Sequence, residues 1–362
     1  MNVTGVQAYA FINARVHGMS SKLLDTNDWN RLDACNNLES LIGILRTTEY
    51  ATFLTGLKEG ELTTRRVAFE IRKRLTNATN MIIKNSPEFA KPLLNLFFQI
   101  NEVDNLKATL RGIQLGATWE TIRYMLFPLE GYTTLPFQKM VEAGNIPNAL
   151  DLLSGTRYRR ALAPAIERYK QENSLFPIEV ALDLDHWQET WSQVNALPQP
   201  DREIARGLLG LIIDKDNLTW AARYRIYHNL SESEIINYTL PFGNKVNDEV
   251  IHAIASGSDL IPIVIKVFPE LAGTVEMGTL GNFDLALIET LVQRLILSKC
   301  RLVYTGVPFN IGVLLAYIIQ LEYEVHDLTL LIEAKSMNIK PSVYQPYLIN
   351  MLDKTGRTNK TR

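Results

Sequence analysis

The sequence predicts an all-α fold made of three pseudo-equivalent helical lobes. Apolar residues recur at helical spacing along most of the chain, strand-like alternation is hard to find, and short segments repeat at offsets of about 105 to 112 residues. The length of 362 residues suits two to three packing units. Because the loops are short, we expect mostly antiparallel helices.

Apolar stripes locate individual helices. One is predicted over 282–300, capped by Asn282, with acidic residues early and basic residues late, as the helix dipole favours. Two others follow from the stripes Val103, Leu106, Leu110, Ile113 and Val325, Leu328, Leu331, Ile332. The segment Leu302–Leu321 carries no charge, but only Ile311–Leu321 reads as continuous helix, about half a membrane span. We interpret it as a core helix.

A short motif occurs three times along the chain. It consists of an acidic residue, two spacers, Asn or Asp, and Leu, at 102–106, 214–218 and 324–328. New helices are expected near Thr118, Ser231 and Asn338. Ser231 with Glu234 forms a capping box, and Pro341 suits a first helical turn. Leu45–Tyr50 also resembles Leu153–Tyr158, and Leu135-Pro-Phe recurs as Leu240-Pro-Phe. Several matches at similar offsets favour three related lobes.

The two ends of the chain are expected to complete one lobe. The third copy stops near Leu348 without its second half, whereas the segment Leu45–Tyr50 belongs to such a half. The predicted lobes are residues 1–86 with 308–362, residues 87–199, and residues 200–307, closing into a funnel or ring.

The polar residues of the motif have two interpretations. Glu102 and Asn105 lie one turn apart on a helix, so they could clamp a neighbouring helix end or a partner's backbone. Hydrogen bonding inside each lobe is favoured, because a repeated fold explains a repeated polar pair beside a core leucine. A threefold catalytic site is not supported, because Arg111 and Arg223 follow the first two copies where the third has Glu333.

Composition and charge exclude several classes of protein. Hydrophobic residues make up 46% and charged residues 21%, which is ordinary for a globular chain. The net charge of −2 gives no general positive field for nucleic acid or an anionic bilayer. Cys35 and Cys300 lie far apart without zinc-ligand spacing, which favours a reducing compartment. The first residues lack a basic start, so no signal peptide is expected.

Motifs for catalysis are missing from the sequence. There is no glycine-rich phosphate loop, nucleophile elbow or HExxH pair, and the five histidines are scattered. The segment at 214–218 begins like a calcium loop but has Leu218 where an oxygen ligand belongs. We therefore predict no catalytic residue, no metal and no cofactor.

Three charged segments remain to be placed. Asp183 and Asp185 could hold a metal, although a solvated turn or helix edge is favoured. A basic run could touch phosphates, although a solvated helix face is favoured; it consists of Arg65, Arg66, Arg72, Lys73 and Arg74. The basic tail after Asp353 is predicted to be disordered.

Three segments together resemble one known family. Tyr9–Val16, the Asp-Asn-Leu copies at 104 and 216, and Gly312–Leu328 are similar to the C subunit of archaeal and bacterial V/A-type ATPases, whose counterpart in the eukaryotic V-ATPase is the d subunit. The resemblance implies a funnel of three helical lobes between the membrane rotor ring and the central shaft of the D and F subunits. The polar positions that match are Asn13, Arg15, Glu102, Asn105, Asp214, Asn217 and Glu324, candidates for partner interfaces or for contacts within the lobes.

The expected function is mechanical. The resemblance implies a non-catalytic central-stalk subunit that couples the proteolipid rotor ring to the D and F subunits, in proton or sodium transport linked to ATP. It would be a peripheral protein on the cytoplasmic face of a membrane, without its own membrane span and without bound nucleotide or nucleic acid. Two alternatives stay open: a generic α-helical repeat scaffold, and an enzyme that uses Asp183 and Asp185.

Overall fold

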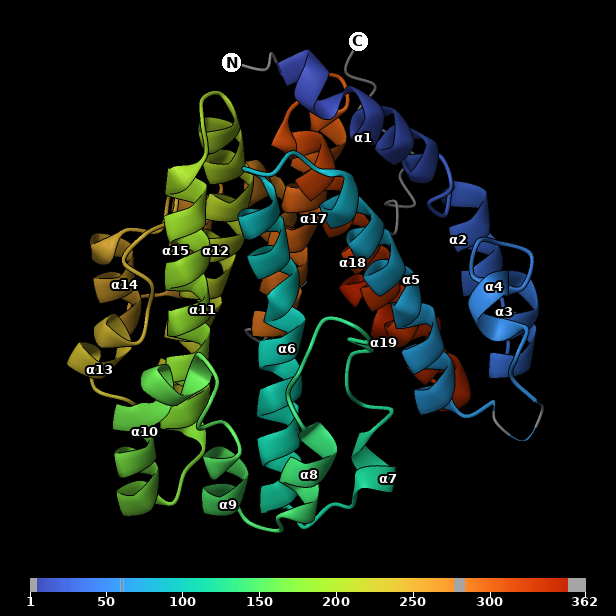
Figure 1. The fold of residues 1–362 in the computed structure, drawn as a ribbon. Helices are drawn as coiled ribbons and strands as arrows, with labels where there is room; N and C mark the ends of the chain where they lie inside the picture. The colour runs from blue at the N-terminus through green and yellow to red at the C-terminus, as the bar shows by residue number, and fades with distance from the viewer. Residues whose placement is uncertain (1–4, 59, 61, 277–283, 351–362) are drawn as a thin grey trace. The chain divides into compact units, whose positions relative to one another are not determined.

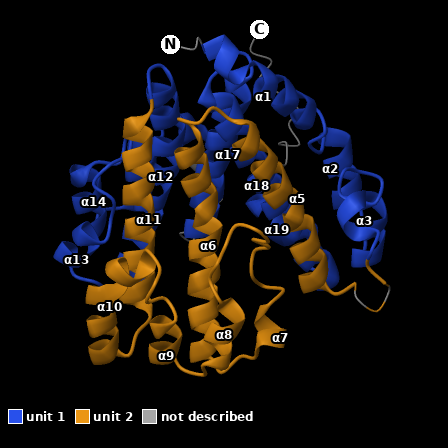
Figure 2. Ribbon diagram, viewed as in Figure 1, with its two compact units in different colours: residues 1–56, 198–362 blue, residues 57–197 orange. Residues whose placement is uncertain are grey.

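The computed structural model describes residues 5–58, 60, 62–276 and 284–350. Over these residues the secondary structure is helical and contains no strand, which confirms the all-α prediction (Figure 1). The chain forms two compact units, residues 57–197 and residues 1–56 with 198–362 (Figure 2). Both ends of the chain therefore belong to one unit. The division into three lobes stays a prediction.

The unit of residues 57–197 is organised around one long helix. Its helices are α5 (Thr64–Asn85), α6 (Lys91–Gln114), α7 (Trp119–Ile122), α8 (Phe137–Glu142), α9 (Ile146–Asp151), α10 (Tyr158–Glu172) and α11 (Phe176–Ala196). The long helix α6 packs against α5, α8, α9 and α11. Val103, Leu106 and Leu110 of its predicted stripe are fully buried in the core of this unit. Apolar spacing thus determines which face of α6 turns inward.

The second unit combines the N-terminal helices with the last part of the chain. Its helices are α1 (Gly5–Ser20), α2 (Thr26–Asp33), α3 (Leu38–Leu45), α4 (Ala51–Leu54), α12 (Asp201–Tyr227), α13 (Glu232–Asn237), α14 (Asp248–Ala255), α15 (Leu260–Val267), α16 (Ala272–Glu276), α17 (Leu285–Val303), α18 (Ile311–Ser336) and α19 (Pro341–Tyr344), with 3-10 turns at Pro269–Leu271 and Gln345–Tyr347. The helices α12, α17 and α18 pack against one another.

The uncharged segment in α18 is a core helix, as predicted. Every residue from 311 to 321 is buried, because α1, α3, α12 and α17 all pack against α18. A helix surrounded on all sides needs apolar residues all round. Among the described helices, none combines the length and hydropathy that crossing a bilayer would take.

Three of the predicted helix starts can be compared with the helices of the structure. The capping box of Ser231 and Glu234 is confirmed at the start of α13, and Thr118 is the N-cap of α7. The start expected near Asn338 is confirmed, because α19 begins at Pro341, the residue expected in its first turn; its N-cap is Lys340. Asn338 itself has a φ of 54°, and this left-handed conformation, which Asn tolerates, follows the end of α18.

The helix predicted over 282–300 is α17. Its N-cap is Asp284, whose carboxylate accepts hydrogen bonds from the backbone N–H groups of Ala286 and Leu287 at 3.0 and 3.2 Å. The predicted cap, Asn282, lies outside the described residues, and so does the tail after Asp353. The helix runs to Val303, three residues beyond the predicted end.

Candidate functional site

The three copies of the acidic motif lie within α6, α12 and α18, and their polar side chains point inward. We call Glu102, Asp214 and Glu324 the first polar positions, and Asn105, Asn217 and Asp327 the second polar positions. All six are buried, with exposed fractions between 0% and 8%. Each pair bonds to chain segments outside its own helix, and we call each pair with its partners a joint.

In the first two joints the second polar position is an asparagine whose side chain bonds to both the N–H and the carbonyl of a single residue. The Nδ2 of Asn105 donates to the carbonyl of Phe127 at 2.8 Å, and the N–H of Phe127 donates to its Oδ1 at 2.6 Å. Asn217 binds Leu240 in the same way, at 2.9 and 2.7 Å. A carboxamide is suited to this role because it both donates and accepts.

The third joint has an aspartate at the second polar position, and its partners differ accordingly. The carboxylate of Asp327 accepts from the N–H of Ile349 at 2.9 Å and from the N–H and Nδ2 of Asn350 at 2.6 and 3.0 Å. A carboxylate only accepts, and here all three partners donate. The exchange of Asn for Asp is therefore matched by the segment that it binds.

The first polar position binds a tyrosine in two of the joints. The hydroxyl of Tyr158 donates to Glu102 at 2.6 Å, and that of Tyr50 donates to Glu324 at 2.8 Å. These tyrosines end the two matching segments found in the sequence. Burial, together with the Glu102 charge, raises the pKa of Tyr158, so it remains a hydrogen-bond donor. Glu324 also accepts from the N–H of Leu24 at 2.6 Å.

In the second joint backbone amides bind the carboxylate of Asp214. It accepts from the N–H groups of Asn244, Lys245 and Val246 at 2.9 to 3.0 Å. Burial raises the pKa of Asp214, and these hydrogen bonds oppose the rise. The turn contains Gly243, with a φ of 151°, and a Cβ there would lie 2.5 Å from Asp214 Oδ1. Only glycine fits this turn.

Asn13 and Arg15 do not belong to any joint. Asn13 is buried in α1, and its Oδ1 atom has no hydrogen-bond partner among the described residues, whereas Arg15 is exposed. The helix α1 makes a different polar contact, which no sequence motif indicated. The hydroxyl of Tyr9 donates to Asp201 at 2.8 Å, and Asp201 also accepts from the N–H of Ile311 at 3.0 Å.

A second group of polar contacts joins the two ends of the chain. Asp33, the last residue of α2, accepts from the hydroxyl of Tyr344 and from the side chain of Gln345, both at 2.8 Å. The Nζ of Lys335 donates to the carbonyl of Asp33 at 2.7 Å. No sequence motif pointed to these residues, because Asp33 is separated from Tyr344 by 311 positions.

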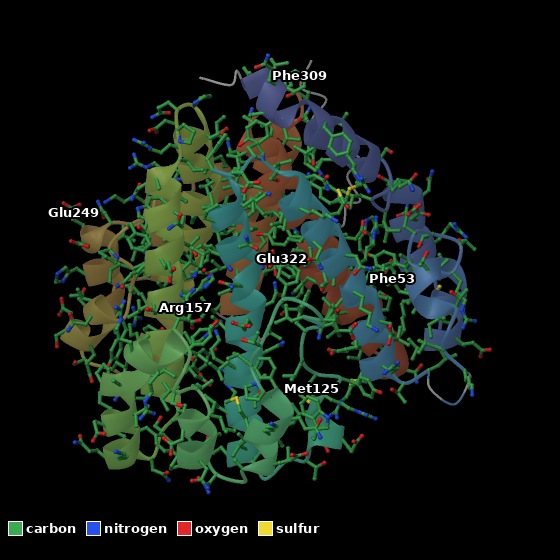
Figure 3. All side chains as sticks on the ribbon, viewed as in Figure 1. Phe53, Met125, Arg157, Glu249, Phe309 and Glu322 are labelled. Carbon is green, nitrogen blue, oxygen red and sulfur yellow. The ribbon has the colours of Figure 1, made fainter. Side chains whose placement is uncertain are left out.

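Asp183 and Asp185 are engaged in ion pairs. Asp183 lies 2.7 Å from the Nζ of Lys107, and Asp185 lies 3.1 Å from Arg157, whose side chain is labelled in Figure 3. Each carboxylate therefore has a cation as partner. The described residues contain no group of three His, Cys, Asp or Glu side chains able to hold a metal.

The basic run at 65–74 is only partly a solvated helix face, and that interpretation was wrong for Arg74, which is buried. Arg66 and Lys73 pair with the buried Glu70 at 2.8 and 2.9 Å, and Arg74 is only 7% exposed. The guanidinium of Arg66 also stacks on the ring of Tyr124. Glu70 lies four residues after Arg66 and three before Lys73, a spacing that lets one acid bind two bases on the same helix face.

The sequence of this chain is similar to those of known proteins over most of its length. The sequence model described as ATP synthase (C/AC39) subunit matches residues 12–347. The chain is similar to the C subunit of the A-type ATP synthase of Methanocaldococcus jannaschii, with 24% identity over 96% of this chain and 88% of the relative. The protein of the same name from Pyrococcus abyssi is 22% identical over 92% and 88%. That from Haloferax volcanii is 20% identical over 96% and 99%.

Proposed function

The chain belongs to the ATP synthase (C/AC39) subunit family, and from this premise we propose that it is the non-catalytic central-stalk subunit of a rotary V/A-type ATPase. It couples the membrane proteolipid rotor ring to the shaft of the D and F subunits. In this way it transmits torque between the ring, where ions are transported, and the part of the complex where ATP is made or hydrolysed. In this role the chain is a peripheral protein on the cytoplasmic face of the membrane.

The three joints are the observation that supports this role most strongly. A body that carries torque has to resist shear between its helices. The helices α6, α12 and α18 are each about 35 to 40 Å long, and one turn of each is fixed to a segment outside the helix by buried, charge-assisted or paired hydrogen bonds. Such bonds are short, directional and strong where water is excluded.

The arrangement of the ends favours this proposal over a generic repeat scaffold. An open solenoid leaves its first and last repeats apart and caps them with polar residues. Here the N-terminal residues Tyr50 and Asp33 bond to Glu324 and Tyr344 near the C-terminus. These contacts hold the segment that contains Asp33 and Tyr50 against α18 and α19 and oppose their separation under load.

Each of the three helices that carry the motif also has an exposed apolar residue at its end, at the same distance from the motif. Leu115, Tyr227 and Met337 each follow the second polar position of their copy by ten residues (115 − 105, 227 − 217, 337 − 327), and they are 84%, 69% and 72% exposed. Exposed apolar side chains at repeated positions suit contacts with other proteins of the complex. Stable docking on each side needs about 1,600 Å² of buried surface.

A three-component reconstitution tests the proposal. The chain is coexpressed with the D and F subunits and then mixed with a purified proteolipid ring carrying an affinity tag. We expect the tagged ring to retain D and F only when the chain is present. Retention of the chain without D and F, or of D and F without the chain, would contradict the coupling role.

A further inference from the structure

The unit of residues 57–197 contains a pocket of about 480 Å³. Asn105 and Phe127 of the first joint line it, but its other lining residues take no part in the hydrogen bonds of the joints. Five aromatic residues contribute to its wall, which we call the aromatic wall: Phe69, Trp119, Tyr124, Phe127 and Phe137. Three cations line the same pocket, Arg66 and Lys73 of α5 and Arg123, which follows α7. Met125, labelled in Figure 3, belongs to the neighbouring loop and is 51% exposed.

The cations are held in place before any ligand arrives. The guanidinium carbons of Arg66 and Arg123 lie 4.6 and 4.5 Å from the ring centre of Tyr124, and the Nζ of Lys73 lies 5.2 Å from that of Phe69. Glu70 pairs with Arg66 and Lys73, and Glu120 pairs with Arg123. Stacked and paired guanidinium groups lose little freedom when they bind a further acceptor.

The repeated fold does not require this chemistry. A pocket of about 450 Å³ lies at the corresponding loop after α13 and is lined by residues 240–249 and Ile251. Its charged lining residues are Lys245, Asp248 and Glu249, so it has one cation and two carboxylates. Of these two pockets, only the first combines several cations with several aromatic residues.

We propose that the pocket lined by Arg66, Lys73 and Arg123 binds an acidic segment of a protein partner, with one carboxylate on these cations and a neighbouring apolar side chain on the aromatic wall. Arginine is well shaped for two-point binding of a carboxylate. The volume exceeds what one carboxylate fills and lies in the range of pockets that take larger ligands. This assignment does not depend on the central-stalk role.

The charge balance favours a single carboxylate over a polyphosphate. The lining cations Arg66, Lys73 and Arg123 are balanced by Glu70, Glu120 and the lining residue Glu130. The flanking Arg65 and Arg72, which donate to the carbonyls of Thr121 and Met125, add two positive charges. Such a modest surplus suits one carboxylate, whereas a nucleotide would bring several negative charges.

Peptide binding to the full chain tests the assignment. A fluorescein-labelled, capped peptide of alternating glutamate, phenylalanine and leucine is titrated with the protein, and a second peptide replaces each glutamate with glutamine. We expect the acidic peptide to bind at least about tenfold more tightly and its binding to weaken with salt. Arg123→Gln should weaken binding about fivefold or more. The matched variant Arg159→Gln, whose arginine pairs with Asp151 outside the pocket, should leave binding nearly unchanged.

Three results would overturn the proposal. These are equal or absent binding of the two peptides, equal losses in Arg123→Gln and Arg159→Gln, and displacement of the peptide by inorganic phosphate or ATP at constant ionic strength. Circular dichroism melting of each variant shows whether it is folded. Trp119→Leu provides a second probe, because it alters the aromatic wall and should weaken both peptides while preserving the preference for glutamate.

Discussion

The hydroxyl of Tyr50 donates a hydrogen bond of 2.8 Å to Glu324, a residue 274 positions later in the chain. The hydroxyl of Tyr158 makes the matching bond to Glu102, at 2.6 Å and across only 56 positions. The same tyrosine–carboxylate contact is thus made once within a continuous stretch and once between the two ends of the chain. This is what a repeat interrupted by the termini would produce.

Replacing Tyr158 by Phe should lower the free energy of unfolding by about 1 to 3 kcal/mol. The substitution leaves the buried Glu102 carboxylate without this donor, and desolvated acceptors are costly to leave unpaired. Urea unfolding followed by circular dichroism measures the change. The control is Tyr227→Phe, at a side chain that is 69% exposed, and it should have no measurable effect. Equal losses in the two variants would refute this account of the first joint.

The same substitution at Tyr50 should cost less than at Tyr158. Glu324 still accepts from the N–H of Leu24 at 2.6 Å when the hydroxyl is removed. The two variants can be compared in one urea series. A larger loss for Tyr50→Phe would mean that holding the chain ends together, and not the pairing of the carboxylate, dominates the energy of this joint.

Asn217→Asp should destabilise the chain by about 3 kcal/mol or more at pH 7, because a carboxylate at this place would be a buried charge. It would also face the carbonyls of Leu240 and Phe242, to which the amide now donates. Asn80→Asp, at an exposed position of α5, is the matched control and should be close to neutral. The idea fails if both variants unfold at the same urea concentration.

His186 should make the chain less stable in mild acid. Burial, with Arg157 and Lys107 nearby, lowers the pKa of His186 to about 3 from its usual 6.5. Between these values the unfolded chain binds a proton that the folded chain does not, so the free energy of unfolding falls as the pH falls. The contribution is about 1.4 kcal/mol per pH unit below about pH 6.

The matched variant for this prediction is His186→Leu. Unfolding midpoints of both chains are measured from neutral pH down to mildly acidic pH. The wild-type midpoint should fall more steeply than that of the variant. Parallel curves would show that His186 takes up its proton in the folded state near the usual pH.

The exposed apolar helix ends should contribute to docking. Met337→Asp and Leu115→Asp should each weaken binding to the proteolipid ring or to the D and F subunits by about tenfold, because a charge replaces an apolar contact. Val343→Asp, at an apolar residue that is 57% exposed and outside the repeated position, is the control. Binding is measured by surface plasmon resonance with each partner immobilised. Equal effects at all three sites would remove the special role of the repeated position.

The helices α6, α17 and α18 were predictable because the spacing of their apolar residues indicates a helix. The stripe in α6 and the uncharged segment of α18 depend on local sequence, and both fold as expected. The start of α19 was predictable for another local reason, because proline suits the first turn of a helix and α19 begins at Pro341.

The joints were predictable only in part. The repeated motif identified Glu102 and Asn105 as a polar pair, since the spacing places them on one face. It could not identify their partners, because the choice between Phe127 and a partner protein depends on tertiary packing. The match between Leu45–Tyr50 and Leu153–Tyr158 contained the clue to both tyrosines, because each match ends on the residue that donates the bond.

The contacts at the ends of the chain left no signal in the sequence. Asp33, Lys335 and Tyr344 belong to no repeated motif, and their meeting follows from the unit that α2 and α18 share. The basic run was misjudged for a related reason. The sequence shows that Arg66 and Lys73 flank Glu70 by one turn, but not that the loop after α7 covers them.

Ion transport and ATP hydrolysis measured in the same reconstituted vesicles test the central claim most directly. Vesicles containing the ring and stator receive the ATPase head with D and F, with or without this chain. We expect hydrolysis in both preparations but ATP-driven ion transport only when the chain is present. Equal transport without the chain would contradict its coupling role.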